Sequence, residues 1–107
     1  ESPVHENWKR AIVDAAETDT AFVNRFGRPG LRAIRTERVA ALEARGNVDL
    51  LEAFGDIPAV YFGGRLEEGI ALTGEVAGRI HDVRPVADVI HDTVREFRVA
   101  AADLARW

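Results

Sequence analysis

The chain has 107 residues, of which 47% are hydrophobic and 30% charged, a balance typical of a folded domain rather than a disordered segment. Its longest apolar runs, such as IPAVYF at 57–62, are far shorter than the ~20 residues that cross a bilayer, and its net charge of −4 argues against nucleic-acid binding. The lack of cysteine excludes disulfides and thiolate metal sites and agrees with the cytoplasmic location that we expect.

The first predicted element is a helix that starts near Val4. Pro3 suits its first turn, where a missing N–H costs nothing, and the polar run ETDT at 17–20 ends it. Its apolar residues recur at the spacing of one helical stripe: Val4, Trp8, Ala11, Ile12 and Ala15.

A β-hairpin is predicted next. The strand-like runs AFVNRF at 21–26 and LRAIR at 31–35 flank the turn sequence GRPG at 27–30, whose two glycines we expect to adopt positive φ. Arginines concentrate here. They are Arg25, Arg28, Arg32, Arg35 and Arg38. We expect them to form a solvated face of the hairpin rather than a phosphate-binding patch.

The middle of the chain reads as short helices. One is expected from about Thr36 to Arg45, with Val39 and Leu42 facing inward and Gly46 as its C-cap. The run VDLLEAFG at 48–55 predicts another, with Asp49 as N-cap and Gly55 as its stop. The run PAVYFGGRLEEG at 58–69 could add a turn or two.

A long amphipathic helix closes the sequence over 86–106, with Pro85 as its first residue. Its inner face needs a partner, so self-association through this helix is expected wherever nothing else covers it. The residues at helical spacing are Val86, Val89, Ile90, Val94, Phe97, Ala101 and Leu104.

The histidines do not form a recognisable metal motif. The run HENWK at 5–9 begins like a zincin helix, but Lys9 stands where the second ligand is needed. His81 and His91 fall on different predicted elements. Structural or surface roles are therefore favoured for all three, and no metal site is predicted. Generic serine-nucleophile and nucleotide-binding motifs are also absent.

The segment EEGIALTGEVAGRIHDVRP at 67–85 is less ordinary, because Gly74 and Gly78 lie four apart in a predicted helix. Two interpretations stay open. The glycines can allow close helix packing, or they can let a flat ligand reach free N–H groups at the helix start. Spacing alone favours packing.

Several stretches, in the same order, resemble the nitronate monooxygenase family, formerly called 2-nitropropane dioxygenases, from the point just after the last barrel strand. They are ESPVH at 1–5, NWKRAIVDAAETDTAF at 7–22, LEARG at 42–46 and LEEGIALTGEVAGRIHDVRPVADVI at 66–90. The related flavin-dependent enoyl-acyl carrier protein reductases share the pattern. The resemblance covers essentially the whole chain, which is therefore expected to be the C-terminal part of a longer enzyme.

The resemblance implies an α/β fold class: the C-terminal segment of an FMN-binding (β/α)8 barrel, mostly helical with one small hairpin when taken alone. Residues 1–72 would form a small substrate-side lid domain, and 73–107 the active-site helix and closing helices. The full protein would oxidise alkyl nitronates with O2, and the isolated chain would be inactive. Alternatives are an enoyl-acyl carrier protein reductase fragment or a non-enzymatic helical interaction module.

The resemblance also suggests site residues. Thr73, Gly74 and Glu75 would border the flavin or substrate, whereas the family's catalytic histidine lies upstream, so no catalytic residue is expected in this chain. Glu75 replaces the usual glutamine, and Arg79 an often-found leucine. A carboxylate can only accept hydrogen bonds, whereas an amide also donates. Without the family's phosphate-gripping loops, this chain should bind FMN weakly or not at all.

Overall fold

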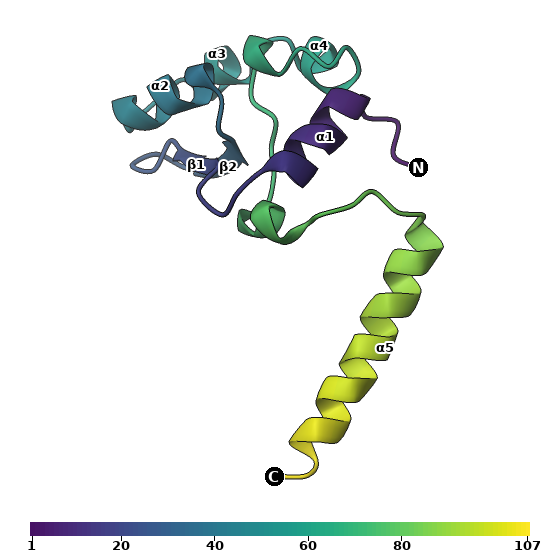
Figure 1. Ribbon diagram of the computed structural model, residues 1–107. Coiled ribbons are helices and arrows are strands. Elements are labelled where there is room, and N and C mark those ends of the chain that lie inside the picture. Colours follow the sequence, from purple (N-terminus) through teal and green to yellow (C-terminus); the bar gives the residue numbers. More distant parts are fainter.

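The computed structural model describes residues 1–107, which form a mostly helical structure with one small hairpin, as the sequence predicted (Figure 1). No helix in it is both long and apolar enough to span a membrane. The elements in chain order are α1 (Glu6–Asp14), β1 (Thr20–Val23), β2 (Leu31–Ile34), α2 (Glu37–Arg45), α3 (Leu50–Phe54), α4 (Ile57–Tyr61), two 3₁₀ helices, η1 (Leu66–Glu68) and η2 (Glu75–Arg79), and α5 (Val86–Leu104).

Strand β2 is hydrogen-bonded on both of its edges. On one side it pairs antiparallel with β1, from Thr20 opposite Ile34 to Val23 opposite Leu31. On the other side the Ile34 N–H donates to the Ala71 carbonyl at 2.9 Å and the Thr73 N–H donates to the Arg32 carbonyl at 3.1 Å. The segment around residues 71–73 is thereby fixed beside the hairpin.

The hairpin is confirmed, but the expected role of its turn glycines is wrong. Neither Gly27 nor Gly30 has positive φ; Asn24 takes the left-handed conformation instead, with φ of 60°. The glycines are needed because other side chains of the hairpin lie close to their Cα atoms. A Cβ on Gly27 would lie 2.4 Å from the Asn24 side chain, and one on Gly30 would lie 2.4 Å from the Phe22 ring.

Helix α1 begins two residues later than the apolar spacing suggested. His5 caps it, because its Nδ1 accepts a hydrogen bond from the Asn7 N–H at 3.0 Å, so Pro3 lies outside the helix rather than in its first turn. The helix ends at Asp14, ahead of the polar run that was expected to stop it. The cap formed by His5 therefore explains why α1 starts later than predicted, while its end lies close to the predicted one.

The helices of the middle region end where their capping residues predicted. Thr36 Oγ1 accepts from the Val39 N–H at 3.2 Å at the start of α2, and Gly46 with φ of 75° closes it. Asp49 accepts from the first turn of α3, and Gly55 with φ of 63° ends that helix. Each cap satisfies backbone groups that the helix itself leaves unpaired.

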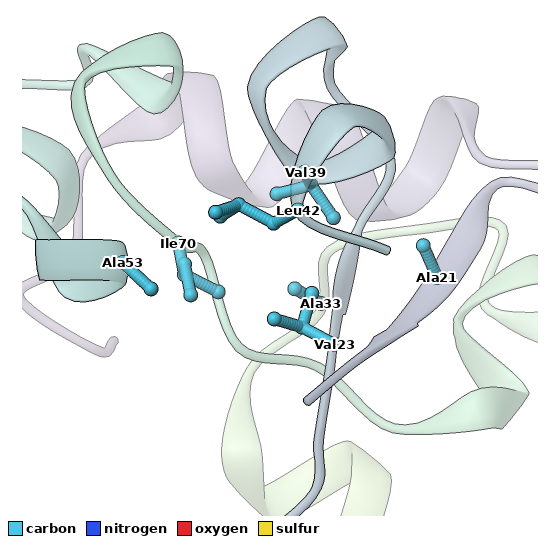
Figure 2. Packing of buried hydrophobic residues seen from close by; sticks show 7 residues of the cluster. All are labelled: Ala21, Val23, Ala33, Val39, Leu42, Ala53 and Ile70. Carbon is cyan, nitrogen blue, oxygen red and sulfur yellow. The ribbon is translucent and has the colours of Figure 1, made fainter. Parts of the chain in front are cut away.

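Two small clusters form the core. The larger one, seen in Figure 2, joins the hairpin to α2, α3 and the strand-like segment that contains Ile70; its members are Ala21, Val23, Ala33, Val39, Leu42, Ala53 and Ile70. The second lies under α1 and contains Trp8, Ile34, Val60 and Ala71. Val39 and Leu42 are buried as predicted. Both clusters are complete without any residue of α5.

The glycine-spaced segment forms a 3₁₀ helix of five residues, η2, rather than a longer helix running through both glycines. Gly78 packs against the end of α1, where an added Cβ would lie 2.6 Å from the Glu17 backbone nitrogen and 2.7 Å from the Ala16 carbonyl carbon. Gly74 is different, since a Cβ there would meet only Val76 Cγ2, at 3.9 Å. Within this chain the packing interpretation therefore applies to Gly78 and not to Gly74.

Helix α5 is confirmed, and it extends away from the rest of the chain (Figure 1). Pro85 is its N-cap rather than its first residue, and none of its residues is buried. Two polar contacts anchor its start. The Val86 N–H donates to Glu1 Oε2 at 2.7 Å, and Arg84 pairs with both Asp82 and Asp92. The pairing raises the pKa of Arg84 and lowers the pKa of Asp92.

Gly78→Ala should destabilise the chain by about 1–3 kcal/mol, because the new methyl group would overlap backbone atoms that cannot rotate away. Gly74→Ala is the matched control. Its backbone has φ of −82°, so alanine fits there, and stability should stay constant or rise by up to about 1 kcal/mol. Urea unfolding of both variants checks this. Equal effects of the two substitutions would contradict the packing assignment.

The isolated chain should self-associate through the exposed apolar side chains of α5, among them Ile90 and Phe97, which are 55% and 71% exposed. Replacing both with glutamate places charge on that face and should yield a monomer. Sedimentation velocity at several concentrations gives the measurement, with Arg98→Glu as a control on an exposed polar position. A wild-type chain that is monomeric at every concentration would contradict the expectation.

Candidate functional site

The three predicted site residues lie where the strand-like segment meets η2. Thr73 is half-buried and pairs through its N–H with β2, while Gly74 and Glu75 are exposed. Gly74 is the N-cap of η2, and no side chain caps that helix. The N–H groups of Gly74, Glu75 and Val76 make no hydrogen bond within the chain. The structure therefore brings an uncrowded glycine and free donors to one exposed edge.

Glu75 has a cationic partner in this chain. Its Oε1 lies 3.5 Å from Arg32 Nη2, and Arg32 Nη1 donates to Thr20 Oγ1 at 2.9 Å. The same guanidinium lies over the Phe22 ring, with Cζ 5.6 Å from the ring centroid. At position 75, where the resembled pattern has glutamine, a carboxylate can bind this arginine through charge-assisted contacts.

A shallow hollow of about 310 Å³ opens beside this edge. Glu75 and Arg79 both line it, together with Glu17 and Val76. The two residues that depart from the resembled pattern therefore share one surface. They bring opposite charges to it, so the hollow differs in polarity from one lined by glutamine and leucine.

The hairpin is held to α2 by Glu43. Its Oε1 accepts from the Phe22 N–H at 3.2 Å, and its Oε2 pairs with Arg35 Nη1 at 2.9 Å. The Phe22 hydrogen bond is the main cause that lowers the pKa of Glu43, and the Arg35 contacts add to it against the opposing effect of burial. This carboxylate is thus a structural anchor under the strand that carries Arg32.

The arginines of the hairpin region do not form one solvated face. Arg32 and Arg35 make the contacts just described, and Arg38 Nη2 donates to the Glu52 carbonyl at 2.9 Å. The reason is tertiary packing: η2 lies beside Arg32, α2 beside Arg35, and α3 beside Arg38. Only Arg25 and Arg28 among the five are free of such bonds, and Arg25 lies over the Phe26 ring at 4.8 Å.

The histidines take separate positions. His5 caps α1, His81 lines a hollow with Arg79 and Arg84, and His91 is exposed on α5. No three or more histidine, aspartate or glutamate side chains gather where they could hold a metal ion. For His5 the structure shows a definite structural role: it caps α1, because it lies directly before the first helical residue.

Two structural residues were missed by sequence reasoning. Arg32 was treated as one of five surface arginines, although the Glu75 departure was a signal for a nearby cation. Asn24 is 4% exposed and links distant segments: its Nδ2 donates to the Pro29 carbonyl at 3.0 Å, and its Oδ1 accepts from the Val48 N–H at 3.2 Å. Its tolerance of positive φ was the available signal.

Comparison with known proteins gives structural matches only. No family model and no curated protein matches the chain. A single-substitution variant of FabK from Thermotoga maritima is 28% identical over 97% of this chain, with a TM-score of 0.76. FabK from the same organism is 25% identical over 95%, with a TM-score of 0.78.

The chain spans 32% and 34% of those two FabK chains, about a third of their length. FabK is a TIM barrel protein, so the match confirms the expected fold class. The division of the chain at residue 72 and the role of Thr73, Gly74 and Glu75 remain predictions.

Glu43 should make stability fall in acid. A carboxyl group whose folded pKa is lowered stabilises the fold above its unfolded pKa of about 4.3, and this contribution is lost as the pH falls through the folded pKa. Glu43→Gln should therefore cost about 1 kcal/mol at pH 7, with the difference from wild type shrinking below about pH 4. Urea unfolding from pH 7 to 3 measures it.

The control for this prediction is Glu67→Gln, on an exposed side chain that makes no ion pair. Its difference from wild type should be small and independent of pH. A constant difference for Glu43→Gln as well would show that the carboxylate does not hold the hairpin through its charge.

Proposed function

We propose that this chain is part of a flavin-dependent oxidoreductase, in which it supplies the substrate-side region and a closing helix. The observation that carries the proposal is the match to FabK over 97% of the chain, with a TM-score of 0.76. FabK is a flavin-dependent enoyl-acyl carrier protein reductase. The colinear resemblance to nitronate monooxygenases supports the same class of enzyme from the sequence side.

The edge formed by residues 73–75 fits one side of an FMN ring system or of its substrate. Gly74 leaves space for a flat ligand, and the free N–H groups of residues 74–76 can donate to carbonyl oxygens at the ligand's edge. The flavin, when bound, would supply the transfer of electrons. Of the two arginines near this edge, Arg32 is engaged by Thr20 and Glu75, whereas Arg79 lines the neighbouring hollow.

Each residue of the edge has a distinct role in the proposal. Thr73 fixes the position of the edge through its hydrogen bond to β2. Gly74 gives access. Glu75 accepts hydrogen bonds and so selects a ligand group that donates them, while the contact with Arg32 orients its carboxylate.

Oxidation of alkyl nitronates by O2 is the reaction we propose first, on the sequence resemblance. Reduction of an enoyl thioester is the second candidate, because both structural matches are FabK. The two candidates differ in reductant and substrate. Nitronate oxidation consumes O2 with the nitronate as electron donor, whereas enoyl reduction needs a reduced nicotinamide.

The test uses the full-length protein that contains this chain. Flavin content, O2 uptake with alkyl nitronates, and nicotinamide oxidation with an enoyl thioester are measured side by side. Gly74→Val should lower flavin content or turnover tenfold or more by obstructing the ligand, with little change in melting temperature, since an added Cβ makes only an ordinary contact with Val76 Cγ2 at 3.9 Å. Residues 1–107 alone should bind FMN weakly or not at all.

Two results would contradict the proposal. If the purified full-length protein held no flavin and turned over neither substrate class, the proposed function would be wrong. Unchanged flavin content and turnover in Gly74→Val would remove the site assignment while leaving the function in place. Glu75→Gln serves as a near-isosteric companion, in which raised turnover of family-typical substrates would mark the carboxylate as a determinant of specificity.

A further inference from the structure

The largest hollow of the chain lies between the hairpin tip and the connection from α2 to α3. None of residues 73–75 lines it. It is a shallow hollow, open to solvent, with a volume of about 640 Å³. It is lined on one side by Asn24, Phe26, Gly27 and Arg28 and on the other by Arg45, Asn47, Val48, Asp49 and Leu50.

The floor of this hollow is rigid. Asn24 is buried and ties the two walls together through its bonds to the Pro29 carbonyl and the Val48 N–H. Gly27 lies so close to the Asn24 side chain that a Cβ would overlap it, and Gly46 is similarly close to the Phe26 ring. These contacts join the two sides of the hollow.

Two arginines on opposite walls have no partner in the chain. Arg28 and Arg45 form no ion pair and no side-chain hydrogen bond, although the chain as a whole carries a charge of −4. The acid in the lining, Asp49, caps α3 through its Oδ1, which accepts from the Leu51 and Glu52 N–H groups, and it pairs with neither arginine. The two exposed guanidinium groups outnumber this one acid in the lining.

We propose that this hollow binds a phosphate monoester of an apolar or aromatic group. A phosphate monoester carries a charge of about −1.5 to −2 at pH 7, which matches two arginines better than a single carboxylate does. Guanidinium groups bind phosphate oxygens in bidentate geometry. The apolar part of the ester would lie against Phe26, Val48 and Leu50, the three hydrophobic residues of the lining.

The experiment titrates phenyl phosphate into the isotope-labelled chain and follows amide resonances by NMR. Saturable shifts are expected at Asn24, Gly27 and Asn47, with weaker binding of inorganic phosphate, which lacks the ring. Arg28→Gln and Arg45→Gln should each weaken binding about tenfold, and Arg45→Lys, which keeps the charge without the planar fork, should weaken it less.

Arg98→Gln is the matched control, because Arg98 is an exposed arginine on α5 that makes no ion pair. It removes the same charge elsewhere and should change affinity less than twofold. Melting curves verify that every variant folds. The proposal is overturned if no shift appears at the hollow up to roughly 10 mM ligand, or if Arg28→Gln and Arg45→Gln bind phenyl phosphate as well as Arg98→Gln does.

Discussion

The double pairing of β2 is the constraint on which the rest of this structure depends. Two strands alone are marginal in water, but here the second edge of β2 is taken by residues 71–73. That pairing draws Ile70 into one cluster and Ala71 into the other, because successive side chains point to opposite faces. It also fixes where Thr73, Gly74 and Glu75 emerge, so the candidate edge is positioned by backbone bonds formed some forty residues earlier in the sequence.

The arginines show how packing decides the use of a charge. Arg32, Arg35 and Arg38 lie where η2, α2 and α3 supply carboxylates or carbonyls, so their charges hold the fold together. Arg28 belongs to the same basic stretch, yet it and Arg45 line a hollow without pairing with any acid of the chain. Net charge cannot separate these groups. Their function follows from which neighbour each guanidinium meets, and that is set by tertiary structure.

The parts of the fold that the sequence predicted are those controlled by local chemistry. Thr36, Asp49, Gly46 and Gly55 mark helix ends by capping, and the spacing of apolar residues revealed α2 and α5. Errors arose at the start of α1, where His5 caps the helix, and where a contact depends on how the folded chain places its neighbours. The roles of Gly27, Gly30 and Gly78 depend on what lies opposite each Cα, and a spacing of four residues could not show that Gly74 is open while Gly78 is crowded. The Arg32–Glu75 contact likewise joins residues 43 positions apart, and only the unusual acid at 75 hinted at it.

Helix α5 illustrates the limit of what this chain determines by itself. Its start is held by a hydrogen bond from the Val86 N–H to the Glu1 side chain and by the ion pairs of Arg84. Surface ion pairs of this kind contribute only about 0–1 kcal/mol each. Covering its apolar side chains would be worth far more, since each large one gains about 1.5–3 kcal/mol on full burial. A surface that covered α5 would therefore dominate its orientation, whereas the two core clusters contain no α5 residue and so hold the hairpin and the 73–75 edge independently of it.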